Sequence, residues 1–250
     1  MNSLADKIAM VTGAASGFGA GIARRYIEEG AKVILADMNY EGAAQLAEEL
    51  GDRAHAVNCN VTSSKDVQAA VDECVRTFGV PDIVVNNAGT THRNQPLLDV
   101  DEATFDRVFA VNVKSIFHMI HAVVPLMRER KNGAIINVGS VAGIRPRPGL
   151  TWYNGSKGAV NLLSKSLAVE LGPDGIRVNN ICPVMGETAL LADFMGVPDT
   201  PENRARFIST IPLGRLSTPA DVAAVAVFLA TDEAAFLNGV ELPVDGGRVV

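Results

Sequence analysis

The sequence predicts an α/β fold: a doubly wound, seven-stranded parallel sheet with helices on both faces. Short β-branched runs alternate with helical stretches of about ten residues or more, which favours parallel strands joined by right-handed crossovers. The strands are nearly continuous apolar runs, as in Ile83–Val85, which indicates burial on both faces. No linker or repeat interrupts the alternation, so we expect residues 1–250 to form a single domain.

The expected strands span residues 8–11, 33–36, 54–57, 83–85, 134–138, 178–181 and 240–244. The expected helices span residues 18–29, 40–50, 65–78, 102–130, 152–171 and 219–230. The least regular stretch, residues 185–210, follows the sixth strand and is interrupted by glycines and prolines. Because ligands bind beyond the carboxyl ends of such strands, this stretch is a candidate substrate lid, with an ordinary surface loop as the alternative.

Composition favours a cytoplasmic protein with a small-molecule ligand. The net charge of −6 offers no electrostatic footprint for nucleic acid or anionic lipid. The three cysteines, Cys59, Cys74 and Cys182, lack a C-x-x-C spacing and a nearby histidine cluster, which indicates buried thiols and no metal site. The first residues resemble no signal peptide, and the apolar stretch near the C-terminus is too short to cross a bilayer, so no membrane partner is expected.

A glycine-rich turn, Thr12–Gly19 (T-G-A-A-S-G-F-G), lies between the first strand and the first helix. Such a turn lets the backbone approach a pyrophosphate, which the N–H groups and dipole of the helix N-terminus stabilise. Its spacing differs from the common G-x-G-x-x-G fingerprint. The position of the turn between a strand and a helix nevertheless predicts a dinucleotide cofactor, held by Gly13, Ser16, Gly17, Phe18 and Gly19.

The choice of cofactor depends on Asp37, at the end of the second strand. A carboxylate there accepts hydrogen bonds from the adenosine ribose hydroxyls and repels a 2′-phosphate. Two like charges about 4 Å apart cost roughly 4 kcal/mol at an effective dielectric constant near 20. Neither Ser16 nor Met38 supplies a compensating cation, so the sequence predicts NAD(H) over NADP(H); the alternative is that Asp37 merely caps a turn.

A catalytic pair is predicted in Tyr153–Lys157 (Y-N-G-S-K), preceded by Ser140 at the end of the fifth strand. Residues four apart share one helix face. A phenol has a pKa near 10, and lowering it toward 7 needs roughly 4 kcal/mol of preference for the phenolate. An ammonium about 4 Å away supplies an amount of that order, so Tyr153 and Lys157 make sense as an acid/base pair. Taken singly, each residue has a plainer interpretation: Tyr153 and Lys157 as a surface pair, Ser140 as a turn residue, and Asn112 as a helix-kink or packing residue.

Together, T-G-x-x-x-G-x-G and Y-x-x-x-K resemble the short-chain dehydrogenase/reductase family, in its roughly 250-residue branch with a Rossmann fold. The resemblance runs from about residue 4 to 248. It implies that Tyr153 exchanges the proton with the substrate oxygen and that Lys157 also binds the nicotinamide ribose hydroxyls. It implies that Ser140 holds the substrate oxygen and that Asn112 positions a water for proton relay.

The same resemblance assigns further cofactor contacts. Cys59–Thr62 is similar to the adenine-binding segment, with Asn60 where the family usually has Asp. Pro183–Thr188 is similar to P-G-x-x-x-T, with Val184 where the family has Gly. The contacts implied by these segments and by the N-N-A-G motif are Asn60, Val61, Asn87, Ala88, Gly89, Tyr153, Lys157, Pro183 and Thr188. A homotetramer, formed through the Tyr-bearing helix and the long helix before it, is implied by the resemblance alone.

We predict an NAD(H)-dependent oxidoreductase that interconverts a secondary alcohol (polyol, sugar or hydroxy acid) and its ketone. One alternative is a 3-oxoacyl-thioester reductase acting on acyl-carrier-protein or CoA substrates. Such reductases commonly use NADPH, which Asp37 disfavours, and carrier-protein docking would need a basic patch such as Arg128, Arg130 and Lys131. A second alternative is a non-catalytic dinucleotide-binding protein, which would tolerate loss of the Tyr or Lys that this chain retains.

Several basic residues flank the motifs, namely His92, Arg93, Arg145 and Arg147. Near the pocket they could hold an anionic substrate such as a carboxylate or a sulfonate. The alternative is that the arginines are solvated or pair with a neighbouring subunit. The sequence leaves both open.

Overall fold

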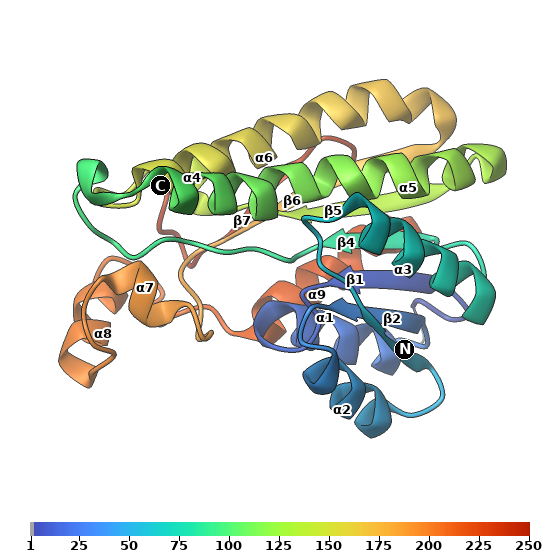
Figure 1. Ribbon diagram of the computed structural model, residues 1–250, viewed down its shortest axis with the longest axis horizontal. Helices are drawn as coiled ribbons and strands as arrows, with labels where there is room; N and C mark the ends of the chain where they lie inside the picture. Colours follow the sequence, from blue (N-terminus) through green and yellow to red (C-terminus); the bar gives the residue numbers. More distant parts are fainter. Residues whose placement is uncertain (1–2) are drawn as a thin grey trace.

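The computed structural model describes residues 3–250 and contains one seven-stranded parallel sheet. The strands lie in the order β3-β2-β1-β4-β5-β6-β7 and every neighbouring pair is parallel (Figure 1). Their bounds are β1 Ile8–Thr12, β2 Lys32–Asp37, β3 Ala54–Asn58, β4 Ile83–Asn86, β5 Gly133–Val138, β6 Ile176–Pro183 and β7 Glu241–Val244. The predicted doubly wound parallel fold is confirmed.

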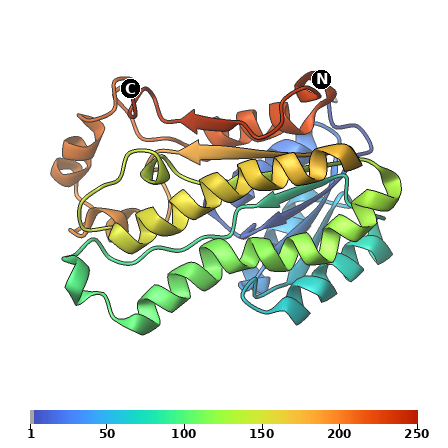
Figure 2. The same ribbon diagram turned by 90° about the horizontal axis from the view of Figure 1, so that it is seen from above.

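Helices cover both faces of the sheet, as Figures 1 and 2 show. One face carries α1 (Gly17–Glu28), α2 (Tyr40–Leu50) and α9 (Pro219–Ala230). The other carries α3 (Ser64–Thr77), α4 (Glu102–Phe109), α5 (Ser115–Arg130) and α6 (Thr151–Leu171). Successive strand residues serve opposite cores: Val11 belongs to the α1/α9 side and Met10 to the α3/α5 side. This alternation explains why the strands read as continuous apolar runs.

The helix predicted over residues 102–130 is broken in the structure. Between α4 and α5, residues Ala110–Lys114 form a π-helical turn that contains the buried Asn112. The Ser115 hydroxyl donates to the Val111 carbonyl at 2.6 Å within this turn. By length and composition residues 102–130 could cross a membrane, but half of the most apolar window is buried in the fold, as in the core helix of a soluble protein.

The strand order reverses between β1 and β4. From β1 the chain adds β2 and β3 toward one edge of the sheet, and from β4 it adds β5, β6 and β7 toward the other edge. In sheets of this kind the ligand binds at that point, beyond the carboxyl ends of the strands. Two short helices, α7 (Leu191–Met195) and α8 (Pro201–Ile208), lie beyond those ends in Figure 1. A small apolar core that includes Val141, Val184, Leu191 and Ile211 joins them to the edge of the sheet.

Candidate active site

A cavity of about 960 Å³ lies along the carboxyl ends of the strands and extends beneath the 185–210 segment. Fifteen of the seventeen predicted site residues line it: Gly13, Ser16, Gly17, Phe18, Asp37, Asn60, Val61, Asn87, Ala88, Gly89, Ser140, Tyr153, Lys157, Pro183 and Thr188. The remaining two, Gly19 and Asn112, lie behind the cavity wall. The sequence motifs therefore converge on one site.

Two glycines of the turn, Gly13 and Gly19, are packed too closely for a side chain. Gly13 has a φ of +65°, and a Cβ there would lie 2.9 Å from the Cα of Ala88. A Cβ on Gly19 would lie 2.1 Å from the Gly13 carbonyl oxygen, so Gly19 is needed for packing of the turn, while its contact with a cofactor stays a prediction. The Asn87 amide donates to the Thr12 carbonyl at 2.8 Å and to the Gly13 carbonyl at 3.1 Å, which fixes the turn against the end of β4.

The N-terminus of α1 lacks the side-chain cap found on other helices. Ser16 makes no capping hydrogen bond and the first turn holds no acidic residue. By contrast, α2, α3, α4, α8 and α9 are each capped by an Asn, Ser, Asp or Thr side chain. The free N–H groups and the helix dipole at α1 therefore suit the pyrophosphate of a dinucleotide.

Asp37 both shapes the turn and lines the cavity. Its carboxylate accepts hydrogen bonds from the Ala15 amide at 2.9 Å and from the Asn39 amide at 2.8 Å. Within the described residues 3–250 it forms no ion pair. The turn-capping interpretation and the ribose-binding prediction are therefore compatible, because each oxygen retains a free lone pair.

Asn60 is engaged more fully than the sequence suggests. Its side-chain oxygen accepts from the Thr62 amide at 3.1 Å and from the Thr62 hydroxyl at 2.8 Å. The oxygen predicted to accept from an adenine amino group thus already holds two donors. Asn60 is exposed at the edge of the cavity, beside the buried Cys59 and Val61.

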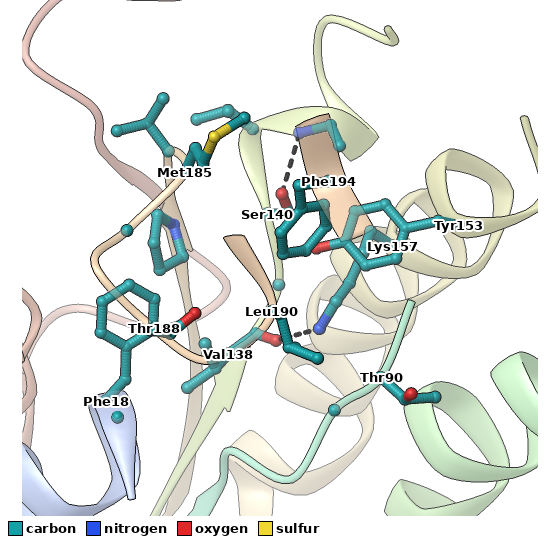
Figure 3. A pocket seen from close by; sticks show the side chains of 18 of the residues that line it. Phe18, Thr90, Val138, Ser140, Tyr153, Lys157, Met185, Thr188, Leu190 and Phe194 are labelled. Atoms are coloured by element: carbon teal, nitrogen blue, oxygen red, sulfur yellow. Dashed lines mark hydrogen bonds between the residues drawn. The ribbon is translucent and has the colours of Figure 1, made fainter. Parts of the chain in front are cut away.

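Tyr153 and Lys157 lie one turn apart on α6, and both are buried (Figure 3). The Lys157 ammonium donates to the Val138 carbonyl at 2.7 Å, and burial lowers the pKa of Lys157 to about 8. Burial raises the pKa of Tyr153 to about 12, although its hydrogen bond with Ser140 and the charge of Arg147 oppose the rise. The predicted lowering of the Tyr153 pKa by Lys157 is therefore not a property of the protein alone, because desolvation dominates.

Ser140 lies two residues after the end of β5, with an extended backbone, and its side chain lines the cavity. Its oxygen accepts from the Ala142 amide at 3.0 Å, drawn as a dashed line in Figure 3. A hydroxyl that accepts one bond still has a proton to donate, so Ser140 can donate to an oxygen of the substrate.

Asn112 connects the loop after β4 to α6. Its side-chain oxygen accepts from the Thr90 amide at 2.8 Å. Its amide group donates to the Thr90 carbonyl and to the Ser156 hydroxyl, both at 2.9 Å. The site geometry thus shows a positioning residue behind the cavity wall, while the water predicted beside Asn112 stays a prediction.

The flanking residues divide into two groups. Arg145 and Arg147 line the cavity, whereas His92 and Arg93 do not. His92 is buried with Nδ1 at 2.8 Å from the Arg93 carbonyl, and the Arg93 guanidinium donates to the Gly196 carbonyl at 3.2 Å. The sequence analysis missed three further lining arginines, Arg107, Arg206 and Arg248, because no motif connects α4, α8 and the C-terminal segment.

A glycine turn at the switch point of a doubly wound sheet, opposite a buried Tyr–Lys pair, defines a dinucleotide-binding oxidoreductase site. The comparison with protein-family models agrees: residues 13–248 match the model described as enoyl-(acyl carrier protein) reductase, which belongs to the short-chain dehydrogenases/reductases. The chain belongs to the short-chain dehydrogenase/reductase family, and the predicted enzyme class is confirmed.

Relatives cover the whole chain. 4-Formylbenzenesulfonate dehydrogenase of Comamonas testosteroni is 51% identical over 98% of this chain and 99% of its own. Cyclopentanol dehydrogenase of Comamonas sp. (strain NCIMB 9872) is 37% identical over 99% of this chain and 98% of its own. A crystal structure of 3-ketoacyl-(acyl-carrier-protein) reductase from Brucella melitensis, complexed with NADH, superposes with a TM-score of 0.94 at 43% identity and covers 99% of this chain and 100% of that one. The predicted cofactor agrees with that NADH complex.

Proposed function

We propose that the protein is an NAD(H)-dependent dehydrogenase that interconverts an alcohol and its carbonyl compound. One observation carries the proposal: Ser140, Tyr153 and Lys157 open into the same cavity as the glycine turn and Asp37. A substrate oxygen held by Ser140 and Tyr153 therefore shares the cavity with the dinucleotide.

The residues present fit NAD(H). The backbone of Gly13 and Gly17 lines the cavity without a side chain in between, and the uncapped N-terminus of α1 supplies free donors. Ser16 and Met38 line the cavity near Asp37, and the Ala15 amide donates to the Asp37 carboxylate; none of these three side chains carries a charge that would neutralise it. The solved relative complexed with NADH, at 43% identity, supports the same choice.

The chain's own residues perform the proton chemistry. When bound, the nicotinamide cofactor accepts a hydride from the alcohol carbon or returns one to the carbonyl carbon. Ser140 donates a hydrogen bond to the substrate oxygen and so orients it. Tyr153 takes the hydroxyl proton during oxidation and gives a proton to the carbonyl oxygen during reduction. Lys157, whose ammonium donates to the Val138 carbonyl at 2.7 Å, would bind the nicotinamide ribose hydroxyls.

The cavity wall around Tyr153 favours an apolar or aromatic substrate body over a sugar or polyol. It is lined by Leu150, Val184, Met185, Leu190 and Phe194. The Phe194 ring packs edge-on against the Tyr153 ring, with 5.0 Å between the ring centroids. Val184, which replaces the family glycine, is one of the side chains that narrow it. The two relatives named for an aromatic aldehyde and for a cyclic alcohol support this substrate class.

A 3-oxoacyl-thioester reductase is the second candidate, favoured by the solved relative of that name. Its NADH complex removes the argument that Asp37 disfavours such an activity. The predicted carrier-protein patch is a poor candidate, because Arg128 pairs with Asp174 at 2.6 Å and Arg130 with Asp82 at 2.7 Å. This patch also lies just before β5 begins, at the amino ends of the strands, whereas the cavity lies at their carboxyl ends.

We extend the proposal to assembly and organisation. The chain acts as one catalytic domain with residues 185–210 as its lid, and works in the cytoplasm. Helices α5 and α6, side by side in both ribbon views, keep Phe117, Leu162 and Val169 more than half exposed. Covering these apolar side chains in a homotetramer would remove them from water.

Fluorescence titration of NADH and NADPH, followed by a panel of alcohols, carbonyl compounds and acetoacetyl-CoA, tests the proposal. We expect NADH to bind at least about tenfold more tightly and apolar or aromatic alcohols to be oxidised with NAD⁺. Turnover restricted to acetoacetyl-CoA would favour the second candidate. Absence of any turnover with intact NADH binding would contradict both.

A further inference from the structure

One end of the cavity is lined by arginines that have no acidic partners among the described residues 3–250. Four of them, Arg145, Arg147, Arg206 and Arg248, form what we call the arginine cluster. Arg145 donates to the Arg248 carbonyl at 2.9 Å, and the Arg147 guanidinium lies over the ring of Phe207, next to Arg206, at 4.6 Å. The loop after β5, helix α8 and the C-terminal segment thus meet here.

Within residues 3–250 none of these four arginines forms an ion pair, whereas seven other arginines do. Asp37 is the one carboxylate among the residues that line the cavity, and it belongs to β2, separated from β5 by β1 and β4. The cluster therefore presents an uncompensated positive charge to the substrate end of the cavity.

Arg147 is half-buried and its backbone is held in place. Prolines on both sides, Pro146 and Pro148, restrict its backbone, and the Asn154 amide donates to its carbonyl at 2.8 Å. Burial lowers the pKa of Arg147, and the charge of Arg248 lowers it further. Because Arg147 also forms no ion pair within residues 3–250, an anion that binds beside its guanidinium would be stabilised.

We propose that the arginine cluster, centred on Arg147, binds an anionic group of the substrate, a carboxylate or a sulfonate. The inference rests on the proposed function and specifies its substrate class. Arg147 and Tyr153 line the same cavity and both contact Phe194: the Arg147 guanidinium donates to the Phe194 carbonyl at 3.4 Å, and the centroids of the Phe194 and Tyr153 rings lie 5.0 Å apart. One small molecule can therefore place its anionic group at the cluster and its alcohol or carbonyl at Tyr153. The apolar walls between them, including Phe194, suit an aromatic or other compact apolar body.

A purely structural role for Arg147 makes a different prediction. Its guanidinium also donates to the Phe194 carbonyl at 3.4 Å, so it could serve only to tether the lid. In that case its loss would weaken all ligands alike. Arg93 provides a matched control, because it also donates to a lid carbonyl, that of Gly196, without lining the cavity.

The test is calorimetric titration of NAD⁺-saturated protein with benzoate, benzenesulfonate and the neutral benzamide. We expect wild type to bind one or both anions at least about tenfold more tightly than benzamide, and Arg147→Met to lose about 10- to 150-fold in anion affinity, the value of a charge-assisted hydrogen-bonded contact. Benzamide affinity should change less than about threefold. Arg147→Lys should restore part of the preference, and Arg93→Met should keep all of it.

Equal binding of anions and benzamide in wild type, or an equal loss of both in Arg147→Met, would overturn the proposal. Oxidation of neutral benzyl alcohol with NAD⁺, measured beside it, separates this inference from the proposed function. Turnover of benzyl alcohol without tighter binding of the anions than of benzamide contradicts the proposed anion site and leaves the proposed dehydrogenase standing. Anion preference without turnover of any alcohol contradicts the proposed dehydrogenase and leaves the anion site standing.

Discussion

Replacing Asp37 by Asn should relax the choice between NADH and NADPH. A carboxylate about 4 Å from a 2′-phosphate costs roughly 4 kcal/mol at an effective dielectric constant near 20. That energy corresponds to about a thousandfold in affinity, and screening of this partly exposed group reduces it. We therefore expect Asp37→Asn to tighten NADPH binding by about 10- to 1,000-fold. NADH should weaken by about five- to tenfold, because a neutral oxygen accepts the ribose hydroxyls less strongly.

The assay is fluorescence titration of both nucleotides against wild type and the variant at fixed ionic strength. The Asn oxygen can keep one of the two amide bonds that the Asp37 carboxylate accepts from Ala15 and Asn39, so the turn should stay folded. Asp52→Asn, in an exposed turn far from the cavity lining, controls for the lost charge. Unchanged NADPH affinity in a folded Asp37→Asn protein would refute the electrostatic argument.

Three further predictions follow from the site and its supports. Because the pKa of Tyr153 is raised to about 12, its basic form is scarce at neutral pH. The kcat/KM for alcohol oxidation should therefore rise from pH 6 to 8, while the kcat/KM for carbonyl reduction stays nearly constant; an oxidation rate independent of pH would contradict this role. Gly19→Ala, whose Cβ would lie 2.1 Å from a carbonyl oxygen, should weaken NADH binding more than about tenfold in a fluorescence titration and lower the free energy of unfolding in urea by about 1–3 kcal/mol. The control Gly155→Ala, whose Cβ would have its nearest neighbour at 4.0 Å, should change neither quantity. Asp221→Ala removes half of a capping box and an ion pair at the start of α9, and should lower the free energy of unfolding in urea by about 1–2 kcal/mol without changing NADH affinity; a loss under about 0.3 kcal/mol would contradict it.

The sheet was predictable because its signal is local. Each strand is an apolar run that needs no knowledge of its neighbours, and the predicted ranges differ from the observed ones by only a few residues. The apolar pattern left out polar residues at the strand ends, such as Lys32 and Asn58, although these residues pair with the neighbouring strand. Pairing depends on backbone groups, which side-chain patterning does not report.

The form of the break in the long helix was not predictable, although a helix kink was one interpretation of Asn112. The segment 102–130 has a continuous helical pattern, yet a π-helical turn occurs at residues 110–114. There Asn112 bonds to Thr90 and to Ser156, which are distant in sequence. Tertiary partners of this kind override local propensity.

The arginines of the substrate end illustrate the same limit. Sequence analysis identified Arg145 and Arg147 as flanking residues but left solvation or subunit pairing open. Arg206 and Arg248 join them only in the folded chain, and the missing acidic partners become visible only there. The Tyr153 pKa was misjudged for a related reason, since spacing shows that Lys157 is near but not that burial dominates.

The central claim is that Tyr153 carries the proton in a dinucleotide-dependent oxidoreduction. Its most direct test is Tyr153→Phe, with turnover of the best alcohol and NADH affinity measured on the same preparation. We predict a loss of at least about a hundredfold in kcat, with the NADH Kd within about threefold of wild type. Turnover within about tenfold of wild type, in a variant that binds NADH normally, would contradict the assignment.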